Sequence, residues 1–151
     1  MSTTPDRFTA EQRGLEDQLA HKWDGWQDDH RSFLDGHFLA VLSTGRRDGS
    51  PQSSVTGYVL DDNGDVLIST KSYTAKYHNV LRQPRVSLVV MDGRAALAVY
   101  GTAIVVDQDP ERKTLTAKIF SRAGGPVPEA VLQDPHRVIL RLRPHSSAFH
   151  S

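Results

Sequence analysis

The sequence predicts a mainly β fold, in which six strands form a small closed barrel and only short helices lie around it. Three observations support this prediction. Six segments show apolar runs or an alternation of apolar and polar residues, as strands do. Turn signals rich in glycine, asparagine and aspartate separate most of these segments. The length of 151 residues fits one domain, which buries about two-thirds of its unfolded surface at this size.

Composition excludes several classes of function. The 18 lysines and arginines are balanced by 18 acidic residues, whereas a general nucleic-acid binder normally has a basic excess. No apolar run approaches the roughly 20 residues of a membrane helix, and the N-terminus has no signal-peptide core. The absence of cysteine excludes disulfides and thiolate sites, and the seven histidines are too scattered to predict a metal site. We therefore expect a soluble, cytoplasmic protein.

The first 32 residues are predicted to form a helical arm ahead of a barrel domain at residues 33–151. A capping box indicates a helix over residues 9–20 of this arm. A second short helix is predicted over roughly residues 27–34, and the glycine that follows two residues later would close it.

The barrel is expected to begin with two strands, over residues 38–44 and 52–60, joined by a turn with an Asp48-Gly49 signal. The second strand alternates apolar residues and glycine with polar residues. Its polar face consists of Ser54, Thr56 and Tyr58. Such a face is compatible with the floor of a ligand site, although a solvated sheet face is the commoner explanation.

The third strand, residues 66–70, runs directly into a helix that Thr74 would cap and Pro84 would end. Hydroxyl side chains and the two lysines Lys71 and Lys76 gather at this junction. The free N–H groups and the positive dipole end of a helix N-terminus can hold a phosphate. The pattern therefore predicts an anion site, with an ordinary capped surface helix as the alternative.

The remaining strands are predicted over residues 85–91, 95–107 and 138–143. The first of these is almost continuously apolar, which predicts burial on both faces. Gly101 inside the second indicates a bulge or a close backbone approach. Asp109 as cap and Pro110 as first residue would begin a helix that runs to about Phe120, with one helical turn following through Gln133.

The order of these elements resembles the split β-barrel of the pyridoxamine 5′-phosphate oxidase-like flavoproteins, over roughly residues 33–144. Lys76 and Asn79, followed by Pro84-Arg85-Val86, most resemble the branch that uses the deazaflavin coenzyme F420. The segments that carry the resemblance are residues 48–55, 70–86, 100–103 and 137–144. The resemblance implies a six-stranded split β-barrel with short peripheral helices.

The same resemblance implies a homodimeric oxidoreductase that uses F420 for hydride transfer to an organic acceptor. Lys76 would bind the coenzyme phosphate, and Asn79 would orient the helix or a coenzyme oxygen. The backbone of residues 52–56 would lie along the ring and stabilise negative charge on it. The implied cofactor-binding residues are Gln52, Ser53, Ser54, Val55, Thr56, Ser69, Thr70, Lys71, Thr74, Lys76 and Asn79. A partner chain usually completes the pocket in this fold, and Trp23, Trp26 and Tyr100 are expected to be available for that role.

Two departures from the family pattern bear on the cofactor. FMN-using members usually place an arginine before the helix lysine, where this chain has Ala75, and residues 58–60 supply no cation. F420 is therefore expected in preference to FMN, and an FMN-dependent reductase or oxidase is the first alternative. A second alternative is a non-enzymatic binder of a flavin-like or tetrapyrrole ligand such as haem or biliverdin, with His145 and His150 as ligands. Against it, histidines this near a chain end are more often solvated.

Overall fold

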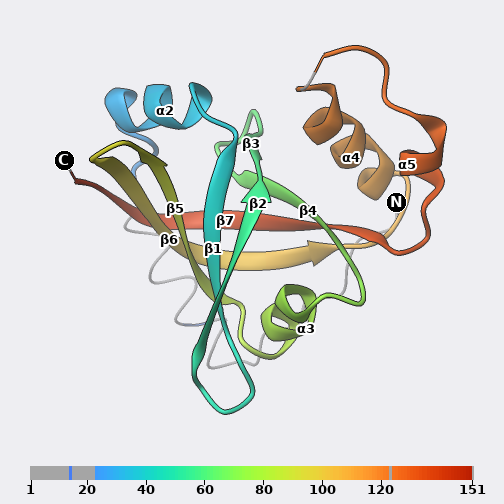
Figure 1. Ribbon diagram of the computed structural model, residues 1–151, viewed down its shortest axis with the longest axis horizontal. Coiled ribbons are helices and arrows are strands. Elements are labelled where there is room, and N and C mark those ends of the chain that lie inside the picture. Colours follow the sequence, from blue (N-terminus) through green and yellow to red (C-terminus); the bar gives the residue numbers. More distant parts are fainter. Residues whose placement is uncertain (1–13, 15–22, 123, 151) are drawn as a thin grey trace.

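The computed structural model describes residues 14, 23–122 and 124–150. Within them, seven strands form one antiparallel sheet: β1 (Leu39–Gly45), β2 (Pro51–Gly57), β3 (Val59–Leu60), β4 (Val66–Lys71), β5 (Arg85–Asp92), β6 (Ala95–Val106) and β7 (Arg137–His150). Their order across the sheet is β2-β1-β5-β6-β7-β4-β3. Figure 1 shows that this sheet is strongly curled.

The second predicted strand is in fact two strands, because the chain bends at Tyr58 between β2 and β3. β2 pairs with β1, whereas β3 pairs with β4 at the opposite end of the strand order. The N–H of Tyr58 donates to the carbonyl of Phe38 at 3.1 Å, and its hydroxyl donates to the carbonyl of Leu34 at 2.6 Å. One run of chain thus links the two edges of the curled sheet, and the predicted split-barrel fold class is confirmed.

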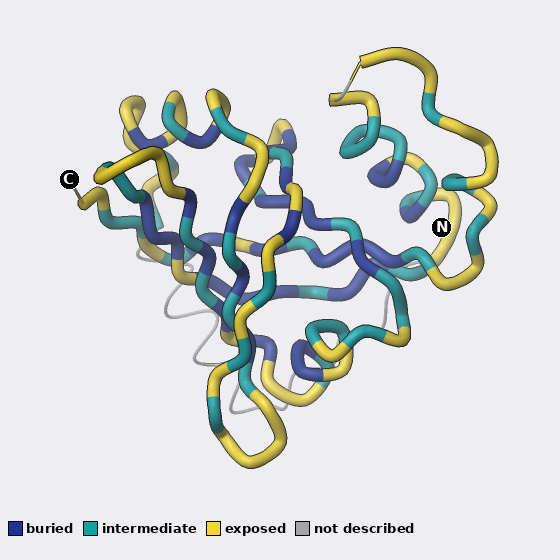
Figure 2. Tube along the Cα trace, in the orientation of Figure 1, coloured by how far each residue is buried: buried dark blue, intermediate teal, exposed yellow. Residues whose placement is uncertain are grey.

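The inside of the curl holds the main apolar core. Buried residues alternate with more accessible ones along β1 and most of β5, as the colouring in Figure 2 shows. Leu42, Leu88, Val99 and Leu140 have at most 1% of their surface exposed, and all belong to one cluster.

The prediction that the strand at residues 85–91 is buried on both faces is wrong for the single chain. In β5, Val86, Leu88 and Val90 are buried, while Met91 is 62% exposed. The near-continuous apolar run therefore supplies alternate residues to the core, while its other residues lie on an outer face that is accessible to solvent.

Four helices with described bounds accompany the sheet: α2 (Asp28–Asp35), α3 (Ala75–Arg82), α4 (Glu111–Ser121) and α5 (Glu129–Gln133). Figure 1 shows α2 and α3 at opposite ends of the curl, with α4 and α5 together at one side. The predicted helix over residues 27–34 is confirmed as α2, which ends at Gly36, and the short turn of helix is confirmed as α5. Across the described residues, no helix has the length and apolarity to cross a membrane.

Helix α4 begins one residue later than predicted, with Pro110 as its N-cap and Glu111 as its first residue. Asp109 does not cap the helix. Its carboxylate instead accepts hydrogen bonds of 2.9 and 3.3 Å from the guanidinium of Arg112, which is buried. The acid expected at the helix start therefore neutralises a buried arginine.

Trp26 packs on the barrel of its own chain. Its indole Nε1 donates to the carbonyl of Gly64 at 2.8 Å, and its ring meets that of Trp23 edge-on at 5.0 Å. The predicted helix over residues 9–20 lies outside the described residues except for Gly14, which is helical. The division into an arm and a barrel at residue 32 stays a prediction.

The pairing of β6 with β7 shifts register between Tyr100 and Gly101, so the irregularity predicted from the glycine is confirmed. Pro144 lies at this shift, opposite Gly101, where the missing N–H of a proline is tolerated. β7 therefore continues past its predicted end, and both histidines lie in this strand, with His145 half-buried and His150 exposed.

Replacement of Gly101 by alanine should destabilise the fold. A Cβ at this position would overlap the carbonyl oxygen of Arg143 and come within 2.8 Å of the Leu142 side chain. We expect Gly101→Ala to lower the free energy of unfolding in urea by about 2–3 kcal/mol. Gly36→Ala is the control, because its Cβ would meet nothing closer than 3.4 Å. Equal stability of the two variants would contradict the predicted clash.

Candidate functional site

The start of α3 has no side-chain cap. Thr74 occupies the N-cap position with an extended backbone, as predicted, but its side chain makes no capping hydrogen bond. Its hydroxyl donates to the carbonyl of Lys71 at 2.9 Å and lies 3.0 Å from the hydroxyl of Thr70. The N–H groups of the first turn therefore stay available to an anion.

Lys76 lies in this first turn and is half-buried. In the part of the chain that the structure describes, no carboxylate lies within ion-pair distance of its ammonium group. Burial lowers the pKa of Lys76 below its ordinary value, because desolvation disfavours the charged form and no anion offsets it. An anionic ligand at the helix start would supply the missing partner.

Ser69 and Lys71 do not lie with the other residues of the predicted phosphate cradle. The hydroxyl of Ser69 accepts a hydrogen bond from Nη1 of Arg137 at 2.8 Å, and Lys71 forms an ion pair with Asp134. The bond from Lys71 lowers the pKa of the Asp134 carboxyl. Since side chains alternate along a strand, these two residues face α5 and β7, whereas Thr70 between them faces inward.

Asn79 is buried and has a structural task. Its amide nitrogen donates to the hydroxyl of Thr44 at 3.1 Å and to Oε1 of Gln52 at 2.8 Å. Its amide oxygen accepts a hydrogen bond from Arg82. The side chain thus ties α3 to β1 and β2, and these bonds leave the amide little capacity for a ligand.

The predicted residues of β2 divide between two faces. Gln52, Ser54 and Thr56 lie in the inner row, opposite Thr44, Leu42 and Ala40 of β1. Ser53 and Val55 lie in the outer row, and Val55 is 69% exposed. Among the described strands β2 pairs only with β1, so the backbone along its other edge has no ladder partner.

These observations define the β2–α3 site as the free edge of β2 together with the start of α3. Among the predicted residues, a hydroxyl contact joins Thr70 to Thr74, Asn79 bonds Gln52, and Lys76 lies in the first turn of α3, while Ser54 and Thr56 follow Gln52 along the inner row of β2. The site offers backbone donors and acceptors, hydroxyl groups and a single unpaired ammonium group.

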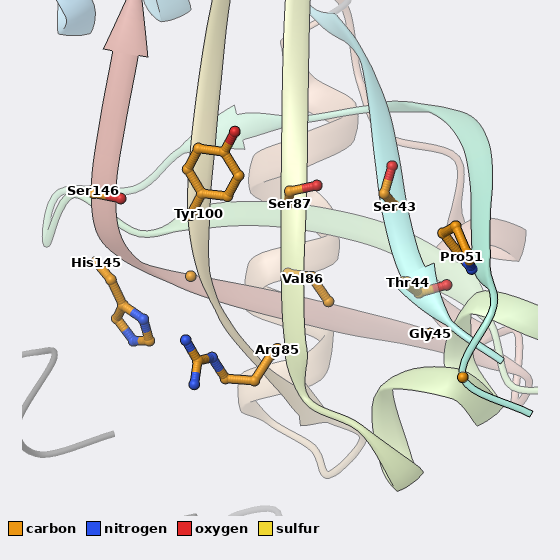
Figure 3. Close-up of a pocket in the computed structure, with 12 residues that line it drawn as sticks. Ser43, Thr44, Gly45, Pro51, Arg85, Val86, Ser87, Tyr100, His145 and Ser146 are labelled. Atoms are coloured by element: carbon orange, nitrogen blue, oxygen red, sulfur yellow. The ribbon is translucent and has the colours of Figure 1, made fainter. Parts of the chain in front are cut away.

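A groove of about 450 Å³ lies on the outer face of the sheet. A row of hydroxyl side chains crosses five neighbouring strands there: Ser53, Ser43, Ser87, Tyr100 and Ser146. All of them except Ser53 line the groove. Figure 3 shows Arg85 and His145 beside each other below Tyr100, and the imidazole Nε2 of His145 lies 2.9 Å from the hydroxyl of Thr102.

Sequence reasoning had singled out Tyr100 and His145 but gave no role to Ser43, Arg85, Ser87 and Ser146. Alternation within each strand places Ser43, Arg85 and Ser87 on outward positions. No sequence signal gives the register that aligns them, because it depends on the pairing of strands far apart in the chain.

The whole barrel matches a known family. Residues 26–151 match the sequence model described as pyridoxamine 5′-phosphate oxidase. A comparison with curated protein sequences finds no match.

Solved structures share the fold. An F420 reductase aligns with a TM-score of 0.69 and 26% identity, over 82% of this chain and 98% of that chain. The conserved hypothetical protein Rv2991 from Mycobacterium tuberculosis aligns with a TM-score of 0.73 and 21% identity, over 83% and 85%. HutZ, the heme storage protein from Vibrio cholerae, aligns with a TM-score of 0.67 and 18% identity, over 83% and 93%. Because the family match spans the entire barrel, the protein belongs to the pyridoxamine 5′-phosphate oxidase family.

Proposed function

We propose that the protein is an oxidoreductase that uses coenzyme F420 to reduce an organic acceptor. The observation that carries this proposal is the uncapped start of α3 with the unpaired Lys76, next to the free edge of β2. The similarity to an F420 reductase, which aligns over nearly its whole length, supports the same coenzyme.

The charge of the β2–α3 site fits the phosphate of F420 better than that of FMN. The deazaflavin coenzyme carries a phosphodiester with a single negative charge, whereas a phosphomonoester such as FMN carries roughly −1.5 to −2 at pH 7. Lys76 is the cation available here, because Lys71 is engaged by Asp134 and faces away. One ammonium group and the helix N–H groups would balance the diester and leave the monoester under-neutralised.

The chain would position the coenzyme with backbone and hydroxyl groups. The free edge of β2 at residues 52–56 would hydrogen-bond the polar edge of the ring, and the hydroxyls of Thr70 and Thr74 would lie near the phosphate. When bound, the coenzyme supplies the hydride chemistry. Asn79 would act indirectly, because its bonds to Thr44 and Gln52 hold α3 and β2 at a fixed separation.

A second copy of the chain is the proposed cover of the outer face. This face carries four large apolar side chains that are at least half exposed: Leu39, Val55, Met91 and Tyr100. Burial of such a patch favours association. In the proposed dimer, the groove of Tyr100, Arg85 and His145 would close the β2–α3 site of the other copy.

Storage of a tetrapyrrole is a second candidate function, favoured by the position of His145 and Arg85 in one groove. The histidine could bind iron and the arginine a propionate. If Nε2 of His145 bound the iron, its hydrogen bond to Thr102 would have to break. This cost makes tetrapyrrole storage a weaker candidate than the F420-dependent activity. An FMN-dependent activity is the remaining alternative, and the charge of the site disfavours it.

Lys76→Ala should weaken F420 binding about ten-fold or more, because a hydrogen bond to a charged group contributes roughly 1.5–3 kcal/mol. Lys71→Ala is the matched control and should change the affinity far less, since that lysine pairs with Asp134. Fluorescence titration at two salt concentrations measures both effects, and added salt should weaken wild-type binding more than that of the mutant. Unchanged binding by Lys76→Ala, with an unchanged melting temperature, would remove Lys76 from the site.

F420 should bind more tightly than FMN to the same preparation of wild-type protein. The expected reason is the single cation available to the phosphate. Titration calorimetry with the two coenzymes and with haem compares the three proposed ligands directly. A higher affinity for FMN, or a protein that is yellow when purified, would favour the FMN alternative instead.

Light scattering at micromolar concentration should give twice the chain mass of 16.8 kDa. The double substitution Leu39→Glu and Met91→Glu should shift the protein to the monomer, because it places charges on the proposed interface. Tyr73→Glu is the control, since Tyr73 is 64% exposed but lies beyond the outer face, after β4. A wild-type monomer at this concentration would contradict the shared site.

A further inference from the structure

A second cavity, of about 300 Å³, lies between the end of α4 and the bend from β2 to β3. It is lined by Phe38, Gly57, Tyr58, Ile119 and Arg122, and we call it the α4 pocket. None of these residues belongs to the outer groove or to the predicted coenzyme contacts. The volume is at the lower end of the range of roughly 300–1,000 Å³ found for small-molecule sites.

The walls of the α4 pocket are mainly apolar. Phe38 is 62% exposed although it is a large aromatic residue, so its ring is available for contact. Ile119 supplies an aliphatic surface from α4. Tyr58 contributes its ring, because its hydroxyl is already bonded to the carbonyl of Leu34, and burial raises the pKa of this phenol to about 12. A ring compound could therefore pack here without leaving a polar group unpaired.

Arg122 gives the α4 pocket a positive charge. Its Nη2 donates to the carbonyl of Asp35 at 2.7 Å and also to the carbonyl of His37. Its guanidinium lies 5.8 Å from the centre of the Tyr58 ring. Within the described residues Arg122 forms no ion pair, and the carboxylate of Asp35 lies 3.8 Å from Arg31 instead. Two backbone carbonyls thus orient a guanidinium that pairs with no acidic side chain among the described residues.

We propose that the α4 pocket binds a small ring compound that carries a carboxylate. The ring would pack between Phe38 and Ile119, and the carboxylate would accept charge-assisted hydrogen bonds from Arg122. Because the pocket combines an apolar slot with one oriented cation, we expect it to bind ring carboxylates more tightly than neutral or cationic ring compounds.

The position of the α4 pocket, at the end of β2, suggests which molecule its ligand is. Gly57 is the last residue of β2, the strand whose preceding residues would lie along the coenzyme. The ligand would therefore be the organic acceptor, a role that rests on the proposed function. Binding of a ring carboxylate to the α4 pocket does not require a coenzyme and can be tested alone.

The test uses two fluorinated probes of equal size, 4-fluorobenzoate and 4-fluorobenzamide, titrated against the full chain by ¹⁹F NMR without coenzyme. Benzoate should bind at least about five-fold more tightly than benzamide, because only the anion gains from Arg122. Arg122→Met should abolish this preference, and Arg122→Lys should retain part of it. Phe38→Ala should weaken both probes alike, because it removes the wall and leaves the charge in place.

Tyr73→Ala is the matched control, an equally exposed aromatic position outside the α4 pocket, and should leave both probes unaffected. A melting curve for each variant separates a lost ligand site from a lost fold, and Phe38→Ala tests the site even if Arg122→Met fails to fold. Equal binding of the two probes, or benzoate binding that survives both Phe38→Ala and Arg122→Met, would overturn the proposal. A normal F420 affinity for Phe38→Ala would show that such a failure leaves the proposed coenzyme site intact.

Discussion

The bend at Tyr58 is the constraint on which most of this structure depends. A straight strand over residues 52–60 would pair along its whole length with β1 and leave β4 without a partner on that side. The buried ring, with its hydroxyl on the carbonyl of Leu34, holds the chain in the turn that sends β3 to β4. The free edge of β2 ends at this bend and Tyr58 itself lines the α4 pocket, whereas α3 meets β2 at its other end, where Asn79 bonds Gln52. The geometry that links the two edges of the sheet therefore also shapes the α4 pocket and sets where the free edge of β2 ends.

Strand alternation decides which polar residues can act together. Ser69, Thr70 and Lys71 are consecutive in the sequence, and a cradle built from all three would need a backbone that is not extended. In β4 they point to opposite faces, so Thr70 joins Thr74 at the start of α3 while Lys71 pairs with Asp134. The same rule places Ser54 and Val55 on different faces of β2. The sequence prediction, based on proximity in the chain, therefore placed two lysines at the start of α3, where the structure places Lys76 and turns Lys71 toward Asp134.

Each of the three proposed sites contains few basic side chains. The β2–α3 site has one unpaired lysine, the outer groove has Arg85 beside His145, and the α4 pocket has Arg122. Elsewhere the buried arginine Arg112 is fully engaged by Asp109 and by backbone carbonyls. Since an unpaired cation that is partly buried costs free energy in the empty protein, Lys76 is better explained by a ligand than by stability, whereas Arg85 and Arg122 are exposed and carry little such cost.

The amino-acid sequence by itself determined the elements and their class. Periodicity, turn residues and helix stop signals predicted most strands, α2, α3 and α5 close to the observed bounds, because these signals act over a few neighbouring residues. They missed the break at Tyr58 and the continuation of β7 to His150. The sequence also indicated the irregularity at Gly101 and the position of Thr74 at a helix start. Only the tertiary structure showed that the Asn79 amide donates its hydrogen bonds to Thr44 and Gln52 and that Lys71 forms an ion pair with Asp134. It alone also showed that five hydroxyl side chains form one row across the sheet. These facts depend on strand register and on contacts between residues far apart in the chain, and no local pattern encodes either of them.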